Sequence, residues 1–393
     1  MSETRVVSPN APTSVTADLA ISAGTLEEVE LEALLETGTA MWAVVFAGGI
    51  GTRFWPLSTP RRPKQVLALV NERPLIADTV ARLSPLVPPE RVLVVTSADI
   101  ADTLHAAIPE VPQANMLVEP RPLGTAAALA WGAQEVARRA GPDTVFVALH
   151  ADLAVGYPDV LRDSLRRAAT IAATEPYLVA LGARPTRAER GFGYLQPGAP
   201  LNPLQSRAVG GACRVEHFVE KPGTALADVL IDKGALWNTG IFVWRARVVL
   251  EELATHTHEV AHGLPTLAAG AMDQFAELVT SVSIDRGLLE RARTVVVLPV
   301  DMAWDDVGTW ASLRRVRELD DTGNGVMGQV HCVDCSGNVI HADGGCVVAY
   351  GISGMIVVSI DGLTFVTTQD RATELGPLLN ALPGSLRFNP GRH

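Results

Sequence analysis

A short apolar run, a glycine turn and a basic loop follow one another within residues 42–65. Residues 42–47 are almost wholly apolar, which predicts the first strand of a parallel sheet that is covered on both faces. Gly48, Gly49 and Gly51 come next, so the backbone there can adopt positive φ and approach an anion without a Cβ in the way. This order of elements predicts an anion site at the carboxyl end of the first strand.

Four basic residues follow the glycine turn: Arg53, Arg61, Arg62 and Lys64. The chain of 393 residues has a formal net charge of −11, so this positive charge is a local concentration. Guanidinium and ammonium groups at a glycine turn suit a polyphosphate, and they predict a nucleoside triphosphate as the ligand. One of the two adjacent arginines, Arg61 or Arg62, is also compatible with a solvated loop cation.

Two other glycine loops do not fit this turn. A Walker loop carries Lys and then Ser or Thr after its last glycine, whereas Gly51 is followed by Thr52 and Arg53. The dinucleotide fingerprint has a third glycine at the position that Phe54 occupies here. The sequence therefore argues against a Walker NTPase and against a nicotinamide oxidoreductase.

The residues GGIGTRFWPL, followed by RPKQ, resemble the signature loop of the sugar nucleotidyltransferases. The Trp before Pro-Leu and the Gln after Pro-Lys are most similar to the form found in mannose-1-phosphate guanylyltransferases. The resemblance implies transfer of GMP from GTP to mannose 1-phosphate, with release of pyrophosphate. Because the attacking phosphate oxygen is already an anion, such a reaction needs cations and a metal to offset charge, and no general base.

The chain divides into three regions of different composition. Residues 1–40 carry seven acidic side chains and one basic side chain, and they predict a flexible extension with one short amphipathic helix. Residues 41–322 alternate apolar strands with helical segments, which predicts an α/β fold with a Rossmann-like, doubly wound mixed sheet. Residues 323–393 contain short β-branched segments between Gly and Asp turns. They predict a small β-rich, β-helix-like domain with a final helix over residues 370–382.

Acidic residues near two strand ends are the predicted metal ligands. Asp152 follows the apolar run 143–149, and Asp306 follows an apolar run much later in the chain. Carboxylate and phosphate oxygens suit Mg²⁺, so the two residues are predicted to hold one Mg²⁺ ion. Asp305 is the alternative to Asp306, and Asp306 is also compatible with the N-cap of a helix over residues 307–319.

The other site residues follow from residue type and from the resemblance. Arg53 is predicted to bind the triphosphate and the leaving pyrophosphate, and Lys64 to bind the α-phosphate and the attacking phosphate. A carboxylate accepts the two adjacent donors of guanine, so Glu119 is predicted to select the base. The resemblance implies nucleotide contacts at Ala47, Gly48, Gly49, Gly51, Thr52, Gly124 and Thr125. It implies contacts to the sugar and its phosphate from the backbone of Gly193 and Tyr194 and from Glu220, Lys221 and Asn238.

Two segments depart from the guanylyltransferase pattern. His150 precedes Asp152 where the family has Pro, and PLGTAAAL stands at residues 122–129 in place of an Asn-Thr-Ala-Pro stretch. Both lie near the expected nucleotide and metal, so another base, another hexose 1-phosphate or a cyclitol phosphate stays open. A nucleotide-binding homologue that has lost turnover is a further alternative, which the presence of the predicted cations and carboxylates argues against.

Composition limits the partners and the compartment. Net negative charge argues against nucleic acid. The sequence holds neither an apolar run of membrane-spanning length nor a secretory signal, so we expect a cytoplasmic enzyme. Cys332 and Cys335, with Cys346 nearby, predict thiols rather than a zinc site, because one CxxC pair falls short of four ligands. Relatives with an added isomerase domain are longer, which implies transferase activity alone, and the β-rich tail is compatible with a homodimer.

Overall fold

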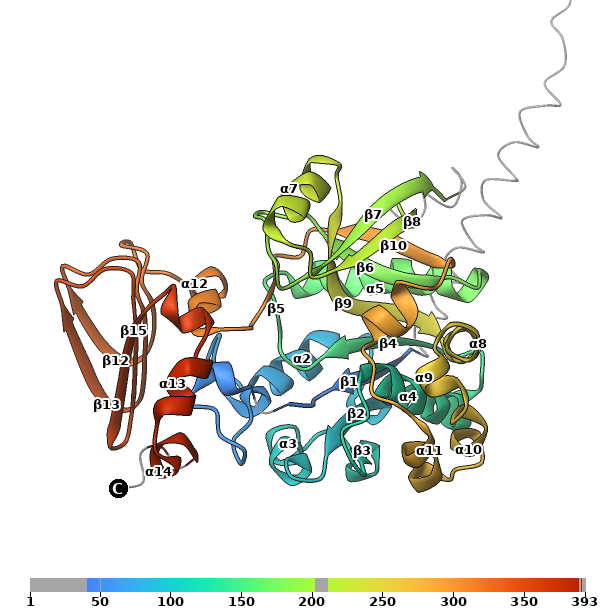
Figure 1. Ribbon diagram of the computed structural model, residues 1–393, viewed down its shortest axis with the longest axis horizontal. Helices are drawn as coiled ribbons and strands as arrows, with labels where there is room; N and C mark the ends of the chain where they lie inside the picture. The colour runs from blue at the N-terminus through green and yellow to red at the C-terminus, as the bar shows by residue number, and fades with distance from the viewer. Residues whose placement is uncertain (1–40, 50, 202–210, 389, 391–393) are drawn as a thin grey trace, which may run out of the picture.

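The computed structural model describes residues 41–49, 51–201, 211–388 and 390, so the predicted extension over residues 1–40 lies outside the described residues. The largest element is a nine-stranded sheet of order β3-β2-β1-β4-β9-β6-β10-β8-β7 (Figure 1). β3, β2, β1 and β4 are parallel neighbours, whereas β9 runs antiparallel to β4 and β6, so the predicted mixed sheet is confirmed. The strands are β1 Trp42–Phe46, β2 Val92–Ser97, β3 Met116–Glu119, β4 Val145–His150, β6 Leu178–Ala183, β7 Gly193–Pro200, β8 Cys213–Glu220, β9 Leu236–Arg245 and β10 Val295–Val300.

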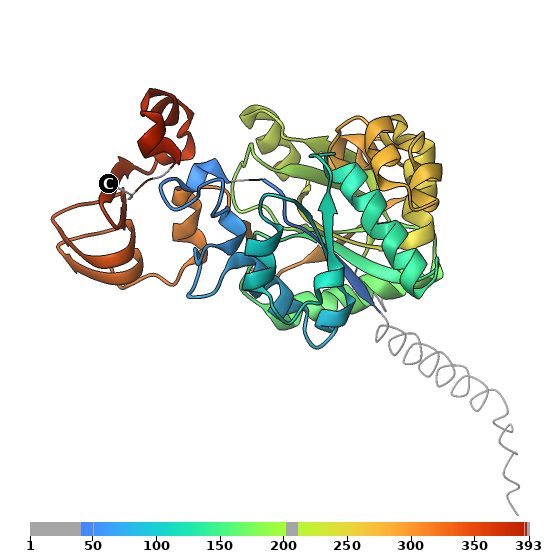
Figure 2. The same cartoon turned by 90° about the horizontal axis from the view of Figure 1, so that it is seen from below.

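Helices cover both faces of this sheet (Figures 1 and 2). Alternate side chains of β1 point to opposite sides, so that Ala43 and Val45 join one buried cluster and Val44 joins the other. The first cluster includes side chains of α2, α3, α5 and α7, and the second includes side chains of α4, α8, α10 and α11. These helices are α2 Leu75–Leu83, α3 Ala101–Ala107, α4 Thr125–Ala140, α5 Pro158–Thr174, α7 Thr224–Asp232, α8 Ala246–His256, α10 Leu264–Ala268 and α11 Met272–Leu278.

The register of the central strands places the glycine turn beside the end of β4. Phe46 of β1 pairs with His150 of β4, and the N–H of Ala151 donates to the carbonyl of Phe46 at 3.0 Å. Glu119 ends β3, which is two strands away from β1 and therefore about 10 Å across the sheet. The glycine turn, Asp152 and Glu119 thus share the edge at which the parallel strands end, where open α/β sheets bind ligands.

The chain after Gly323 forms a second sheet of four strands, with the order β12-β13-β14-β15, at the left of Figure 1. β12 and β14 both run parallel to β13, and β15 runs antiparallel to β14. The predicted strand-rich C-terminal region is therefore confirmed. Its strands are β12 Gly325–Val333, β13 Val339–Tyr350, β14 Met355–Ile360 and β15 Leu363–Thr368.

A continuous apolar cluster joins this second sheet to the loop after β1. Phe54 and Trp55 of the loop pack in one cluster with Trp310 and with Ile356 and Phe365 of the second sheet. The indole N–H of Trp310 donates to the carbonyl of Trp55 at 2.9 Å. Figures 1 and 2 both place this loop between the large sheet and the C-terminal strands. The C-terminal region thus supports the loop that carries the predicted triphosphate residues.

The prediction of one helix over residues 307–319 is wrong. Thr309 forms a capping box that starts a 3-10 turn, and the short helix α12 (Leu313–Val316) ends before Arg317, whose backbone is extended. The buried guanidinium of Arg317 donates to the carbonyl of Leu69 at 2.7 Å, so tertiary contacts hold this residue outside the helix. Thr309 is therefore the capping residue of this segment, and Asp306 lies before it in a strand.

The prediction of one helix over residues 370–382 is also wrong. A 3-10 turn, Arg371–Thr373, precedes a separate helix α13 (Gly376–Ala381), and α14 (Gly384–Phe388) follows. Pro377 lies in the first turn of α13, where its missing N–H is tolerated, but it cannot continue a helix that began earlier. The Gly-Pro pair therefore restarts the helix.

Among the described residues, no helix is both long and apolar enough to cross a bilayer. The four cysteines are free thiols. Cys335 is buried, and its thiol donates to the carbonyl of Val333 at 3.3 Å, whereas Cys332 on β12 is partly exposed.

Replacement of a buried side chain in the second sheet tests its packing against the loop. Ile356 is fully buried in the joining cluster, so Ile356→Ala should lower the free energy of unfolding by about 2–5 kcal/mol. Val348 is 71% exposed on the neighbouring strand, and Val348→Ala should change it by less than about 0.5 kcal/mol. Urea unfolding of both variants measures the difference, and equal effects would contradict this packing.

Candidate active site

The glycine turn is held in place by the end of the basic loop. Gly51 has φ of 69°, and a Cβ at this position would lie 2.6 Å from the Cβ of Lys64. The buried side-chain amide of Gln65 donates to the carbonyls of Gly48 and Gly49 at 2.7 and 3.2 Å. The two ends of the loop therefore close on each other, which requires glycine at position 51.

Lys64 forms an ion pair with Asp152 at the end of β4. Burial alone would raise the pKa of the Asp152 carboxyl, but the charges of Lys64 and His150 lower it below its usual value. Asp152 is therefore ionised at neutral pH despite its burial. The pair ties the basic loop to a strand-end carboxylate.

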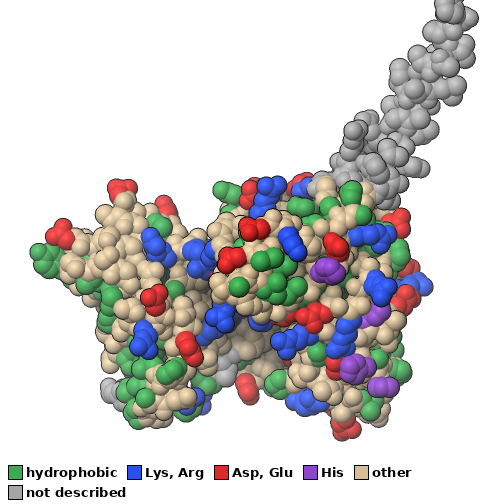
Figure 3. All heavy atoms as spheres, turned by 45° about the horizontal axis from the view of Figure 1, so that its top comes forward, with side chains coloured by type: hydrophobic (Ala, Val, Ile, Leu, Met, Phe, Trp, Pro, Cys, Tyr) green, Lys and Arg blue, Asp and Glu red, His purple; other side chains and the backbone are tan. Residues whose placement is uncertain are grey.

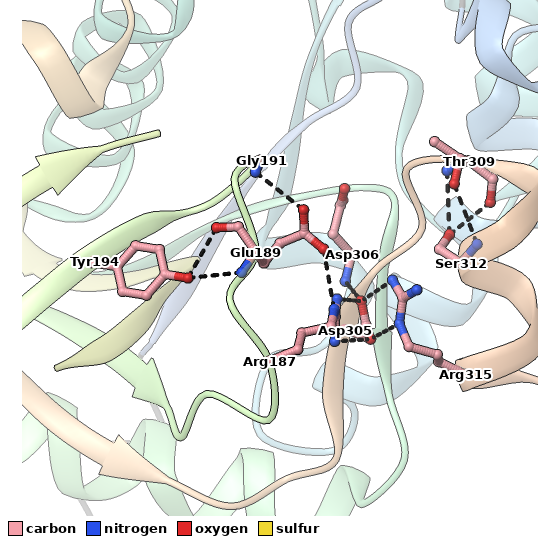
Figure 4. Close-up of polar contacts among 9 residues, drawn as sticks. All are labelled: Arg187, Glu189, Gly191, Tyr194, Asp305, Asp306, Thr309, Ser312 and Arg315. Atoms are coloured by element: carbon pink, nitrogen blue, oxygen red, sulfur yellow. Dashed lines mark hydrogen bonds and ion pairs between the residues drawn. The ribbon is translucent and has the colours of Figure 1, made fainter. Parts of the chain in front are cut away.

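The second predicted metal ligand lies on a short two-stranded ribbon. β5 (Leu153–Val155) pairs antiparallel with β11 (Trp304–Asp306), and Asp306 is opposite Leu153. Successive side chains of a strand point to opposite sides, so Asp305 and Asp306 cannot face the same space. Figure 4 shows the two carboxylates pointing apart.

Asp305 is held by two arginines (Figure 4). Both guanidinium ends of Arg187 lie 3.2 Å from its carboxylate oxygens, and Arg315 donates to the same oxygens at 2.6 and 3.1 Å. The backbone N–H of Asp306 also donates to Asp305 Oδ1 at 2.8 Å. Because these donors already bind both oxygens of the Asp305 carboxylate, the geometry favours Asp306 over Asp305 as a metal ligand.

The carboxylate of Asp306 faces the cavity. Burial, together with the charge of Asp152, raises the pKa of Asp306 to about 6, although Lys64 and Arg53 oppose the shift. Asp306 and a guanidinium nitrogen of Arg53 both lie against Gly308, where an added Cβ would come within 2.5 Å and 3.5 Å of them. A divalent cation would offset the repulsion between the two carboxylates, so the oxygen donors present fit a hard divalent metal.

A cavity of about 590 Å³ lies at this edge of the sheet. Figure 3 shows a surface hollow between the C-terminal lobe and the larger body, with Lys and Arg side chains gathered along it. The cavity brings together predicted residues from distant segments of the chain: Arg53, Asp152, Gly193, Glu220, Lys221, Asn238 and Asp306. Its described lining leaves out other predicted residues, which are Ala47, Gly48, Gly49, Gly51, Thr52, Lys64, Glu119, Gly124, Thr125 and Tyr194. Lys64 nevertheless reaches the cavity through its ion pair with Asp152.

Glu220 ends β8 and Lys221 follows it, and both residues line the cavity. Lys221 Nζ lies 2.7 Å from Glu220 Oε1, and the Lys221 side chain is 58% exposed whereas that of Glu220 is buried. Gly193 pairs with Glu220, and a Cβ there would lie 2.9 Å from Glu220 Oε2. Glycine at position 193 therefore makes room for a carboxylate that points into the cavity.

The Tyr194 side chain lies in the core and does not face the cavity. Its hydroxyl accepts the N–H of Glu189 at 3.0 Å and donates to the Glu189 carbonyl at 2.9 Å. The Glu189 carboxylate in turn accepts the N–H of Gly191 at 3.2 Å and contacts Arg187 (Figure 4). Tyr194 thus positions the loop that borders the cavity.

Asp285 lines the cavity but was not predicted from the sequence. It accepts a hydrogen bond from the amide of Asn238 at 2.9 Å. Burial, followed by the charge of Glu220, raises the pKa of Asp285 to about 6. Its segment reads as an ordinary helical stretch, and no local pattern indicates that this carboxyl is buried. His150 also lines the cavity; its position was predicted to be unusual, but no role was assigned to it.

The predicted base-binding residue is a partly buried carboxylate. Burial raises the pKa of Glu119 to about 7, although the N–H of Leu123 opposes the shift. Among the described residues, Glu119 Oε1 has no hydrogen-bond partner. A buried acceptor without a donor is unfavourable, and a ligand that brings N–H donors would relieve it.

Residues 282–284 contact the start of α4. The N–H of Ala126 donates to the carbonyl of Val282 at 3.2 Å, and Thr125 Oγ1 accepts the N–H of Ile284 at 2.9 Å. A Cβ on Gly124 would lie 2.7 Å from the Val282 carbonyl oxygen. Contacts of Gly124 and Thr125 to a nucleotide stay a prediction.

Substitutions at the two adjacent aspartates should separate their roles. Asp305→Asn leaves two guanidinium groups without a full counter-charge and should lower the free energy of unfolding by about 3 kcal/mol. Asp306→Asn removes a buried charge that repels Asp152, so without divalent metal it should leave this free energy unchanged or raise it. Urea unfolding at neutral pH in the presence of a chelator measures both, and the reverse order of effects would contradict the geometry.

Comparisons with known proteins establish the family of the chain. The sequence profile of the family described as "Nucleotidyl transferase" matches residues 42–322. A mannose-1-phosphate guanylyltransferase of Sinorhizobium fredii is 31% identical over 351 residues, covering 86% of this chain and 67% of the relative. Mannose-1-phosphate guanylyltransferase 2 of Escherichia coli O157:H7 is 31% identical over 354 residues, with 86% and 73% covered.

A solved structure extends the likeness to the fold. The crystal structure of a protein from Thermus thermophilus, named as a mannose-1-phosphate geranyltransferase, superposes with a TM-score of 0.78 and 35% identity. The match covers 87% of this chain and 98% of that chain. The resemblance that the glycine loop indicated is thereby confirmed. The chain belongs to the nucleotidyl transferase family, in which it groups with the mannose-1-phosphate guanylyltransferases.

Proposed function

We propose that this enzyme transfers GMP from GTP to mannose 1-phosphate and releases pyrophosphate. Sugar-1-phosphate nucleotidyl transfer is the reaction of the family, and the relatives named above support mannose and guanine as the specific sugar and base. The observation that carries the proposal is the cavity in which Arg53, Asp152, Lys221 and Asp306 meet from distant parts of the chain. It offers cations and metal-binding carboxylates together, as the joining of two phosphates requires.

In the proposed reaction an oxygen of the sugar phosphate attacks the α-phosphorus of the nucleotide. The bond from that phosphorus to the bridging oxygen of the leaving pyrophosphate breaks. Lys221, which is exposed at the cavity wall, binds the sugar phosphate, and buried Glu220 accepts hydrogen bonds from ring hydroxyls. Arg53 binds the β- and γ-phosphates, and Lys64 lies near the α-phosphate. These residues hold two anions in line and offset the charge of the leaving group.

Nucleotidyltransferases of this family generally use a divalent metal, and we propose that Mg²⁺ fills this role here. Asp152 and Asp306 would hold the ion. When bound, Mg²⁺ would supply positive charge to the phosphate oxygens that become more negative during the transfer. The ionised state of Asp152 and the raised pKa of Asp306 support a shared cation at this place.

The C-terminal region is proposed to be a domain that starts near residue 323 and resembles a β-helix. The parallel pairing of β12 with β13 and of β13 with β14 supports this arrangement, because stacked parallel rungs produce such pairs. Exposed apolar side chains on its strands, including Val348 and Tyr350, support a homodimer contact there.

Removal of one metal-binding carboxylate should abolish most turnover. We expect Asp152→Asn to reduce kcat by about 100-fold or more at saturating Mg²⁺, because the ion loses a ligand and Lys64 loses its partner. Asp163→Asn is the matched control, since that side chain is 62% exposed on α5 and lies outside the described cavity linings, and it should retain wild-type turnover. Pyrophosphate release measures both variants, with a chelator as the metal-free reference. Turnover of Asp152→Asn within a few-fold of wild type would refute the assignment.

The pH dependence of GTP binding should report on Glu119. Guanine offers two N–H donors, which an ionised carboxylate accepts. Burial raises the pKa of Glu119 to about 7, so Glu119 must lose its proton before it can bind guanine in this way. GTP affinity should fall as the pH drops below 7, by up to about tenfold per pH unit, and level off above it. Glu119→Gln should remove this dependence. Equilibrium binding of GTP across this range is the measurement, and an identical pH profile in the variant would exclude the contact.

A matrix of GTP, ATP, UTP and dTTP against mannose, glucose and cyclitol 1-phosphates tests the substrates directly. The proposal predicts that GTP with mannose 1-phosphate gives the highest kcat/KM for pyrophosphate release. Preference for a pyrimidine nucleotide, another hexose or a cyclitol would replace the stated substrates. Absence of pyrophosphate release from every pair, by a protein that still binds GTP, would favour a non-catalytic homologue.

A further inference from the structure

A second cavity of about 370 Å³ lies beside the catalytic one, and we name it the arginine pocket. Four guanidinium groups line it, from Arg73, Arg82, Arg162 and Arg315, and the single carboxylate in its described lining is that of Asp78. The lining itself carries a formal charge of +3 within a chain whose net charge is −11, and two of its arginines also pair with carboxylates outside the lining, Arg162 with Asp159 and Arg315 with Asp305. Such an excess at one concave site attracts anions.

Asp78, the single carboxylate in the described lining of the arginine pocket, contacts several donors. Asp78 accepts a hydrogen bond from the amide of Asn71 at 2.6 Å, and it lies 3.7 Å from Arg73 Nε and 3.6 Å from Arg82 Nη2. The Arg82 side chain is only 11% exposed. Burial lowers the pKa of Arg82, Asp78 opposes this shift, and the charge of Arg73 adds to it. A bound anion would offset the repulsion that Asp78 leaves uncompensated.

Backbone contacts hold the guanidinium groups in fixed positions. Arg82 Nη1 donates to the carbonyl of Leu153 at 2.8 Å, and Arg162 Nη1 donates to the carbonyl of Arg82 at 2.9 Å. Arg315 uses Nε and Nη2 for Asp305, and Arg162 uses Nη2 for Asp159. Each guanidinium has five N–H donors, so these contacts fix the groups while further donors stay available for a phosphate. A site whose groups are already ordered binds with little additional loss of entropy.

The ribbon of β5 and β11 connects the arginine pocket with the catalytic cavity. Ala154 and Val155 of β5 line the arginine pocket, whereas Leu153 and Asp306 line the catalytic cavity. Arg315 lines both cavities and binds Asp305, whose neighbour is the proposed metal ligand. An anion that binds Arg315 in the arginine pocket would therefore change the contact between Arg315 and Asp305. Asp305 is next to Asp306, which lines the catalytic cavity.

We propose that the arginine pocket binds a compact phosphate-bearing metabolite and that its occupancy changes catalysis through Arg315 and Asp305. The volume lies near the lower end of the range of about 300–1,000 Å³ for small-molecule sites, which favours inorganic phosphate or a sugar monophosphate over a dinucleotide. The two cavities share Arg315, so an anion that draws this residue away from Asp305 would make the differential contact that coupling requires. Binding at the arginine pocket does not depend on the substrates of the catalytic cavity.

Calorimetric titration with inorganic phosphate, and separately with a hexose 6-phosphate, tests the site. The catalytic cavity also attracts phosphate, so the titrations compare the full chain, Arg53→Gln, Arg73→Gln/Arg162→Gln and the control Arg166→Gln. Arg166 lies on the same helix as Arg162 but outside the pocket lining. We expect Arg53→Gln and Arg166→Gln to retain the arginine-pocket binding, and the double variant to lose about tenfold or more in its affinity.

Two results would show that the anion occupies the catalytic cavity alone, and either would overturn the arginine-pocket site. One is wild-type binding in Arg73→Gln/Arg162→Gln, and the other is loss of all binding in Arg53→Gln. Absence of binding by the wild-type chain would also overturn it. If the double variant fails to fold, Arg73→Gln alone serves, since that side chain is 57% exposed, and its affinity should fall by about threefold or more. Tighter binding of the hexose 6-phosphate than of inorganic phosphate would identify a sugar phosphate as the ligand, and equal binding would identify free phosphate.

The coupling has its own measurement. At a phosphate concentration that fills the arginine pocket, kcat or the KM for the sugar 1-phosphate should change at least about twofold in wild type and in Arg166→Gln, but not in Arg73→Gln/Arg162→Gln. Direct competition at the catalytic cavity would persist in the double variant, which distinguishes it from coupling. Binding without any kinetic difference between these proteins would overturn the coupling, and failure of the proposed substrates would leave the titration result unaffected.

Discussion

The ion pair between Lys64 and Asp152 joins the basic loop to the edge of the large sheet. Loop and carboxylate come from the ends of neighbouring parallel strands, since Phe46 pairs with His150. Burial alone would raise the pKa of Asp152, whereas the charge of Lys64 lowers it, so the two side chains stabilise each other in a partly buried place. The proposed phosphate binding at the loop and the proposed metal binding at the strand end would therefore be parts of one electrostatic arrangement.

The position of that loop depends on parts of the chain far away in sequence. Trp310 packs against Phe54 with ring centroids 5.4 Å apart, and it donates a hydrogen bond to the backbone of Trp55. Trp55 meets Phe365 of the C-terminal sheet at 5.5 Å. The C-terminal strands thus lie within packing distance of the catalytic loop. A change in their packing, including one caused by association of two copies, would act on the loop through direct contact.

Local patterns were sufficient for the parts of the site that lie at strand ends. The apolar run of β1, the glycines that follow it and the position of Asp152 after β4 follow from periodicity and from the rule that ligands bind at the carboxyl ends of strands. The prediction of a helix over residues 307–319 was wrong because Thr309 caps the segment after its expected start, and the buried Arg317 has an extended backbone before its expected end. Propensity summed along a segment does not reveal such tertiary contacts.

Other parts of the site have no local pattern. Asp305 and Asp306 are equivalent in sequence, but Arg187 and Arg315 bind Asp305 whereas Asp306 faces the cavity. The burial of Asp285 depends on its contact with Asn238, and the core position of Tyr194 depends on a loop that folds back onto its hydroxyl. The arginine pocket likewise collects its cations from a loop and from three separate helices. Each of these features arises from contacts between distant segments.

Asp152 and Asp306 are proposed to share one cation, which would offset the repulsion between their carboxylates. Anomalous scattering from crystals soaked with Mn²⁺, GTP and mannose 1-phosphate locates that cation directly. The account predicts a peak within coordination distance, about 2.0–2.3 Å, of carboxylate oxygens from both Asp152 and Asp306, with Arg53 on the triphosphate. A peak bound elsewhere in the cavity, or a complex in which Lys64 and Asp152 stay paired without metal, would contradict it.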